Sequence, residues 1–107
     1  MLYLMSTTVI PAGADGIWEM DSISPEIAAA IATGQEFTSA VGHASSAEAM
    51  TAVLGVSVLA NRITVVPEPG DCFLCLRLNS RPPEGAILNR EEMHKIGFSW
   101  ALLSYRG

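Results

Sequence analysis

Cysteine and charged residues are both scarce in this chain of 107 residues. Two cysteines are too few for a small disulfide scaffold, so we expect reduced thiols and a cytosolic protein. Charged residues make up only 16% of the chain and hydrophobic residues 50%, a composition that excludes a disordered tail. A chain of this length is expected to form one domain, over residues 1–107, around a single hydrophobic core.

Long hydrophobic runs are also absent. No apolar run approaches the length of about 18 residues that a membrane-spanning helix needs. The N-terminal segment 1–13 has no basic region and only a short, mixed apolar run, so it does not match a secretory signal peptide. The sequence therefore predicts a cytoplasmic protein without membrane contact.

Basic residues are outnumbered by acidic ones, six against eleven, which gives a net charge of −5. A protein that grips duplex DNA usually carries a basic face, so we expect no binding to duplex DNA. A small anionic ligand is still compatible with this charge, because two arginines and a helix N-terminus are enough to hold one. The basic residues, which form no run, are Arg62, Arg77, Arg81, Arg90, Lys95 and Arg106.

Signals for strands and helices alternate along the chain. Ser24 is a good N-cap, Pro25 suits a first helical position and Gly34 suits a helix end, which together predict a helix. The fold expected from the whole order is α/β, with a mixed β-sheet of about five strands and about three helices packed on it. Strands are predicted over 2–10, 17–20, 37–42, 62–66, 72–79 and 98–105, and further helices over 46–54 and 89–96.

His43 is the residue most suggestive of chemistry. It follows Gly42 at the end of a predicted strand and precedes a predicted helix, where Ser45 and Glu48 have the spacing of a capping box. Free backbone N–H groups at a helix N-terminus bind phosphate, and the hydroxyls of Ser45 and Ser46 add donors there. The alternative is a histidine that only caps the helix or faces solvent.

Two arginines leave one face of the strand predicted over 72–79. Strand alternation places Arg77 on the face opposite the leucines, and Arg81 continues the same phase. Guanidinium groups at a strand end can hold phosphate oxygens. Only two prolines separate Arg81 from Glu84, so a rigid loop presents both charges to one site. The alternative is ordinary surface solvation or a salt bridge.

Cys72 and Cys75 have C-x-x-C spacing, but we expect them to be packing residues. In a strand, residues three apart point to opposite faces, so the two thiols cannot share one metal ion. The chain also has no dinucleotide fingerprint and no phosphate-binding glycine loop. The sequence therefore predicts no metal site and no cofactor.

Several short segments, taken in order, resemble a known family. They are Met1-Leu2-Tyr3-Leu4, Val9-Ile10-Pro11, Ser39-Ala40-Val41-Gly42-His43, Leu54-Gly55-Val56, Asn61-Arg62-Ile63, Glu68-Pro69-Gly70-Asp71 and Arg81-Pro82-Pro83-Glu84-Gly85. In this order and spacing they resemble the viral ring nucleases, which are anti-CRISPR proteins that counter type III systems, and their host-encoded relatives. The resemblance runs over essentially the whole chain.

The resemblance implies a function. Members of that family are α/β homodimers that bind cyclic tetra-adenylate at the two-fold interface. They cut the ring, without a metal or cofactor, into linear di-adenylates that end in a 2′,3′-cyclic phosphate. The expected partners are therefore cyclic tetra-adenylate and a second copy of the chain. If the source is a virus, the place of action is the host cytoplasm.

The resemblance also implies roles for individual residues. The matching positions make His43, Arg81 and Glu84 the catalytic residues. Cleavage by the substrate's own 2′-hydroxyl needs in-line geometry, a proton for the leaving 5′-oxygen and stabilisation of the charged phosphorane. His43 would supply the proton, Arg81 the stabilisation, and Glu84 would orient the loop or keep His43 protonated. Ligand contacts are expected from Ser6, Gly42, Ser45, Ser46 and Arg77.

The chain differs from the family pattern at a few positions. Ser6 stands where relatives often have asparagine, Ala44 where an acidic residue is common, and the loop has two consecutive prolines. These differences bear on ligand affinity and rate more than on the type of reaction. Two other functions fit the same residues: a protein that sequesters or senses a cyclic oligonucleotide without cutting it, and a viral protein that only assembles with partners.

Overall fold

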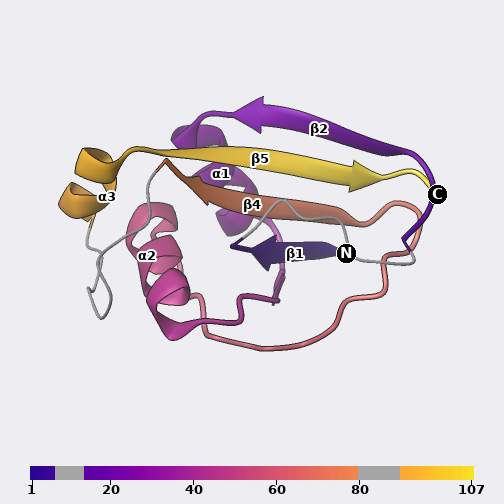
Figure 1. Cartoon of the computed structure of the whole chain (residues 1–107), viewed down its shortest axis with the longest axis horizontal. Helices are drawn as coiled ribbons and strands as arrows, with labels where there is room; N and C mark the ends of the chain where they lie inside the picture. Colours follow the sequence, from indigo (N-terminus) through magenta and orange to yellow (C-terminus); the bar gives the residue numbers. More distant parts are fainter. Residues whose placement is uncertain (7–13, 80–89) are drawn as a thin grey trace.

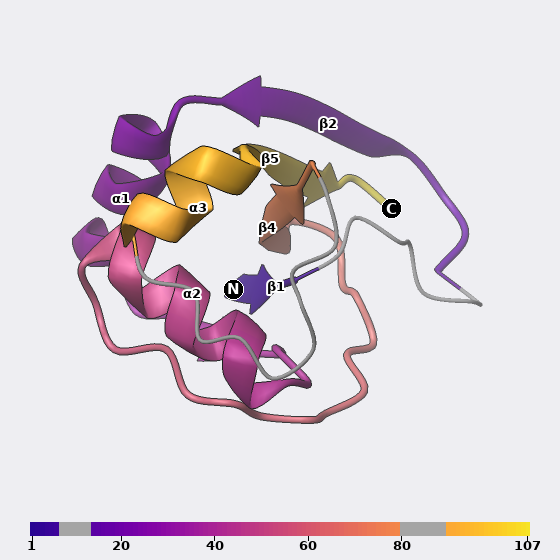
Figure 2. The same ribbon diagram turned by 60° about the vertical axis from the view of Figure 1, so that its left-hand side comes forward.

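The computed structural model describes residues 1–6, 14–79 and 90–107. In these ranges the chain forms a five-stranded mixed sheet with three helices on one face (Figures 1 and 2), which confirms the predicted α/β architecture. The sheet order is β2-β5-β4-β1-β3. The elements are β1 (Leu2–Met5), β2 (Trp18–Ile23), α1 (Pro25–Gly34), β3 (Thr38–Ser39), α2 (Ala44–Leu54), β4 (Cys72–Leu78), α3 (Arg90–Ile96) and β5 (Phe98–Tyr105).

Strand direction divides the sheet into two parts. β1 lies in the parallel part, because it pairs in parallel with β3 on one side and with β4 on the other. β5 runs antiparallel to β4, and β2 runs antiparallel to β5. The register places Leu4 opposite Leu74 and Ser39. The carboxyl ends of β1, β3 and β4 therefore meet at one edge of the sheet, where open α/β sheets commonly bind ligands.

The main core lies between the sheet and the helices. Alternate residues of the central strands, such as Leu4 and Leu74, are fully buried there, as strand alternation requires. Trp100 of β5 is the largest of the fully buried side chains, with an exposed fraction of 0%. The helices contribute small residues and a few larger ones to this core: Ala28, Ala32, Ala47, Ala49, Met50, Val53, Leu54 and Met93.

The opposite, helix-free face of the sheet has a smaller core of its own. Phe73 and Leu103 are buried there together with Cys75 and Ala101. An aromatic row crosses this face: the ring centroids of Tyr3 and Phe73 are 5.3 Å apart, those of Trp18 and Phe73 are 5.4 Å apart, and those of Trp18 and Tyr105 are 4.7 Å apart. Such spacings are those of favourable aromatic pairs, so the row ties four strands together.

The two cysteines lie on opposite faces of β4, as predicted. Cys72 packs against the helix-side core and Cys75 is buried in the smaller core. Burial raises the pKa of the Cys75 thiol to about 12, and the positive charge of Arg77 opposes this only in part. The Cys75 thiol is therefore a packing group that resists ionisation.

This raised pKa makes stability depend on alkaline pH. The ordinary value is 9.0, so above that pH the thiol ionises in the unfolded chain but stays protonated in the folded one. The folding equilibrium constant is expected to fall by about tenfold for each pH unit until the folded thiol also ionises. Urea unfolding at neutral and alkaline pH measures this slope. Cys75→Ala should flatten it and Cys72→Ala should not; equal slopes in all three proteins would contradict the prediction.

The ends of α1 and α2 test the predicted helix signals. Ser24 caps α1, accepting a hydrogen bond from the Ile27 amide at 3.2 Å, and Pro25 is the first helical residue, both as predicted. α2 ends at Leu54 and is capped by Gly55, which takes the left-handed conformation with φ 75°. The capping box predicted at Ser45 is wrong. α2 begins at Ala44, so His43 is the N-cap and Ser45 lies inside the first turn.

The strand predicted over 62–66 is also wrong, since the structure has no regular element between α2 and β4. This long connection runs around the outside of the molecule in Figure 2. Ile63 and Val66 are 43% and 80% exposed, so no neighbouring strand covers them. A β-prone composition favours a strand only where a pleated, half-buried surface receives the side chains. β3 is likewise limited to two of the residues predicted over 37–42.

Candidate functional site

Three of the predicted ligand residues, and the predicted catalytic residue His43, lie at or just beyond the carboxyl ends of the three parallel strands. Ser6 directly follows β1, the Gly42–His43 pair follows β3 by a short connection, and Arg77 is the last residue but one of β4. Since β1 lies between β3 and β4, Ser6 lies between the other two segments. The sequence-predicted residues that the structure describes therefore share one edge of the sheet. Arg81 and Glu84 lie outside the described residues.

His43 occupies the N-cap position of α2 in an extended conformation, with φ −127° and ψ 134°. Its carbonyl accepts the hydrogen bond from the Ala47 amide at 3.1 Å that closes the first helical turn. Its imidazole is exposed and forms no capping hydrogen bond. The backbone of His43 is therefore held by the helix, while its side chain is left available to a ligand.

The first turn of α2 fits an anion. Ser45 and Ser46 lie in this turn, one exposed and one half-buried, and the turn contains no acidic residue. Because the N-cap side chain does not accept from the helix, the first amide N–H groups keep their hydrogen-bonding capacity. The positive end of the helix dipole points the same way, so phosphate oxygens are favoured beside His43.

Arg62 also lies at this edge, although the sequence alone predicts no role for it at the site. Its Nη2 donates to the carbonyl oxygen of Gly42 at 3.5 Å, across twenty positions of the chain. A Cβ atom placed on Gly42 would lie 3.7 Å from Nε of Arg62, so the guanidinium stem runs alongside this glycine. An exposed guanidinium one residue from His43 adds a cation to a site that the first turn of α2 already makes electropositive.

Arg77 lies on the helix-free face of β4, as strand alternation predicts, where it is opposite Ser99 of β5. Its side chain is half-buried, and its Nε atom is buried without a hydrogen-bond partner among the residues that the structure describes. A buried donor of this kind costs free energy unless a ligand or water satisfies it. Arg77 therefore keeps bonding capacity close to the carboxyl ends of the parallel strands.

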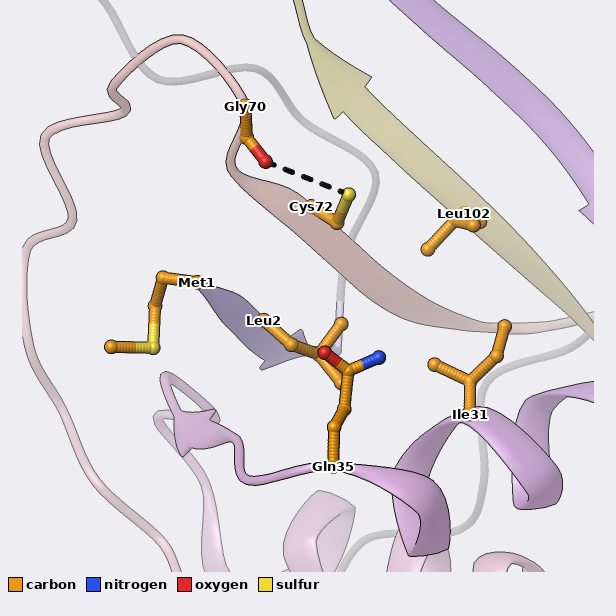
Figure 3. A pocket seen from close by; sticks show the side chains of 7 residues that line it. All are labelled: Met1, Leu2, Ile31, Gln35, Gly70, Cys72 and Leu102. Carbon is orange, nitrogen blue, oxygen red and sulfur yellow. Dashed lines mark hydrogen bonds between the residues drawn. The ribbon is translucent and has the colours of Figure 1, made fainter.

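A cavity at the opposite end of the sheet is a poorer candidate. It measures about 190 Å³ and lies where β1 and β4 begin (Figure 3). Polar groups of its lining residues include the Gly70 carbonyl, the Cys72 thiol, the Gln35 amide and the Met1 ammonium, which is already paired with Asp71 at 3.4 Å. The thiol lies 3.9 Å from the Gly70 carbonyl oxygen. No arginine or lysine is among its lining residues, which makes it a poor match for a phosphate ligand. The other lining residues are Leu2, Ile31 and Leu102.

A second cavity, of about 340 Å³, lies beside β3, next to the segment that carries Arg62. Its lining is uncharged: Phe37, Ser39, Ser57, Leu59, Ala60 and Asn61.

Within the described ranges no three His, Cys, Asp or Glu side chains gather as metal ligands would. None of the helices described is both long and apolar enough to cross a membrane.

Comparison with known proteins places the chain among viral relatives. A family model described as STIV B116-like matches residues 2–100. The uncharacterized protein ORF117 of Acidianus two-tailed virus is 34% identical over 102 residues, which cover 92% of this chain and 87% of the relative. The uncharacterized protein 26 of Sulfolobus islandicus filamentous virus is 29% identical over 102 residues, covering 92% and 86%.

One solved structure shares the fold. B116 of Sulfolobus turreted icosahedral virus superposes with a TM-score of 0.79, covering 97% of this chain and 98% of that protein. The two sequences are only 18% identical, so the likeness concerns the fold alone.

Proposed function

The chain belongs to the STIV B116-like family, and we propose that it is a metal-independent ring nuclease that cleaves cyclic tetra-adenylate into linear di-adenylates. The named relatives are proteins of archaeal viruses, which supports an action against host signalling. The segments that resemble those of the viral ring nucleases, in the same order along the chain, support the proposed substrate and the proposed reaction. The observation that carries the proposal is the exposed imidazole of His43 at an uncapped helix start, with Arg62 beside it.

The proposed reaction needs only groups of the substrate and of this chain. The 2′-hydroxyl of one adenylate attacks the adjacent phosphorus, so a 2′-oxygen–phosphorus bond forms and the bond to the 5′-oxygen breaks. The imidazolium of His43 gives its proton to the leaving 5′-oxygen, and the proton of the attacking hydroxyl passes to solvent. A positioned general acid of this kind contributes about 10²–10⁴-fold to the rate.

Stabilisation of the phosphorane is assigned to the cations around His43. Arg62 and the first-turn amides of α2 supply positive charge among the described residues, and Arg81 is proposed to add to it. Glu84 is proposed to orient His43 or its loop. Ser6, Gly42, Ser45, Ser46 and Arg77 are proposed to contact the ring, since their positions at the same edge suit a ligand larger than one nucleotide.

A homodimer is part of the proposal, because a two-fold axis presents equivalent sites to the two halves of a four-fold ring. The helix-free face of the sheet is compatible with a partner. Tyr3 and Trp18 are only half-buried there, and Met20, which pairs with Leu103 on the same face, is 55% exposed. Light scattering or analytical ultracentrifugation measures the oligomeric state directly.

Incubation with labelled cyclic tetra-adenylate in EDTA tests the activity. The expected product is di-adenylate with a 2′,3′-cyclic phosphate, identified by chromatography and mass spectrometry. Linear tetra-adenylate is the matched control substrate, and rings of other sizes test the preference. Tight binding without product would instead identify a protein that sequesters or senses the ring. If the protein neither bound nor cleaved a ring of any size, the proposal would be overturned.

A further inference from the structure

Two segments that are distant in the sequence are hydrogen-bonded to each other just before His43. We name residues 39–42 and 59–62 together the clasp. Within it, the Asn61 amide donates to the Val41 carbonyl at 2.7 Å, and the Asn61 side-chain Nδ2 donates to the Ser39 carbonyl at 2.7 Å. In the other direction, Ser39 Oγ donates to the Leu59 carbonyl at 2.6 Å. The clasp therefore holds the chain that leads directly into Gly42 and His43.

The hydrogen bonds of the clasp begin where the pairing of β3 with the sheet ends. β3 ends at Ser39, and only the Ala40 amide, which donates to the Leu4 carbonyl at 2.9 Å, continues its pairing with β1. Beyond that point the carbonyls of Ser39 and Val41 are bonded to Asn61 alone among the partners the structure describes. The direction in which the chain approaches α2 thus depends on the two bonds of Asn61, followed by the bond from Arg62 to the Gly42 carbonyl.

The segment that carries Asn61 is itself anchored. Thr51 of α2 accepts at Oγ1 from the Val58 amide at 2.9 Å, and the same hydroxyl lies 3.2 Å from the Val58 carbonyl. One connection is therefore tied to the body of α2 through Thr51 and to the chain that leads into α2 through Asn61. Between these two anchors, the N-cap position of His43 has little freedom to shift.

We propose that Asn61 is a positioning residue for His43. Its side-chain amide holds the Ser39 carbonyl and its backbone amide holds the Val41 carbonyl, so that the imidazole at the start of α2 is aimed at the reacting phosphodiester. The proposal rests on the proposed function for its catalytic consequence, whereas the positioning itself can be observed without a substrate. A displacement of about 1 Å from a change outside the reacting groups can lower a rate by about 10²-fold.

Single-turnover cleavage of cyclic tetra-adenylate tests the catalytic consequence. Asn61→Ala loses the Nδ2 donor and keeps the backbone bond to Val41, so we expect a rate lower by about 10- to 100-fold. Asn61→Asp keeps the shape but turns an acceptor toward the Ser39 carbonyl, and should be impaired at least as much. Asn61→Gln retains an amide and should recover part of the rate. Ring affinity should change little, because Asn61 acts through His43.

Nuclear magnetic resonance gives a readout that does not need activity. The chain has two histidines, so His43 can be followed with His94 as an internal reference. In Asn61→Ala the His43 backbone and imidazole should become more mobile and the Val41 amide, which donates to Ser39 Oγ at 3.3 Å, should exchange faster, with His94 unchanged. Gln35→Ala removes an exposed amide at the opposite end of the sheet and is the matched control.

The two readouts separate the two proposals. If His43 keeps its order and the Val41 amide keeps its exchange protection in Asn61→Ala, the positioning role is wrong, whatever the rate does. If His43 becomes mobile but the wild-type protein cleaves no ring, the positioning role stands and the ring-nuclease proposal fails. If His43 becomes mobile and the rate of an active wild type is unaffected, the inferred link between the clasp and catalysis is wrong. A thermal midpoint close to that of the wild type confirms that the variants are folded.

Discussion

Replacing His43 by alanine is expected to lower single-turnover cleavage of cyclic tetra-adenylate by about 10²–10⁴-fold, the loss typical of a missing general acid. The imidazole is exposed and makes no capping bond to α2, so its removal should leave the fold and much of the ring affinity intact. Rate and affinity measured on the same preparation separate these effects. A variant that still cleaves at the wild-type rate would contradict the role assigned to His43.

Two other variants make the His43 result specific. His94→Ala removes the second histidine, whose ring packs against Phe98 on another element, and should leave cleavage unchanged. Arg62→Gln removes the guanidinium beside Gly42 and should weaken ring binding more strongly than His43→Ala does. If Arg62→Gln left affinity unchanged, the phosphate contact assigned to Arg62 would be wrong.

Replacing Trp100 by alanine is expected to lower the free energy of unfolding by about 3–5 kcal/mol, as for other large aromatic residues in a core. Trp100 has an exposed fraction of 0% and lies on the helix-side face of the sheet, in register with Leu76 of β4 and Ile23 of β2 on the neighbouring strands. Its removal leaves a cavity that the neighbouring strands cannot fill without breaking their pairing. Urea unfolding followed by circular dichroism measures the loss.

Phenylalanine at the same position separates packing from hydrogen bonding. The Trp100 Nε1 atom is buried and has no hydrogen-bond partner within residues 1–6, 14–79 and 90–107, a situation that costs about 1–3 kcal/mol for a buried donor. Trp100→Phe should therefore cost clearly less than Trp100→Ala. In the matched variant Trp18→Phe, a donor that is bonded to the Ala14 carbonyl at 3.1 Å is lost instead. Equal losses for Trp100→Phe and Trp100→Ala would contradict this account.

Local signals predicted the helices and strands well where neighbouring residues decide them. α1 follows from Ser24 and Pro25, because a cap and a first-turn proline act within one helical turn. β5 coincides with the predicted range 98–105, since its alternation persists along eight residues. The capping box failed because Ser45 competes with His43 for the cap, and only the end of the preceding strand decides which residue starts the helix.

The residues of the candidate site also fall into two groups, those that local sequence signals identify and those that they do not. His43 and Arg77 could be singled out because their residue types and their places at element ends are visible in the sequence. Arg62 and Asn61 could not be assigned, because nothing in their neighbourhood says which carbonyls they reach. Their partners lie about twenty positions earlier, on the far side of α2.

The sequence by itself determined the kinds of element, the alternation that divides β4 between two cores, and the presence of a histidine before a helix. These features depend on backbone preference and side-chain period over a few residues. Only the tertiary structure decided that β1 lies between β3 and β4, so that Ser6, His43 and Arg77 share one edge. The tertiary structure also brought Asn61 and Arg62 close to the residues that lead into His43. Contacts between distant segments cost loop-closure entropy that packing of the whole chain must offset, and no local pattern encodes that balance.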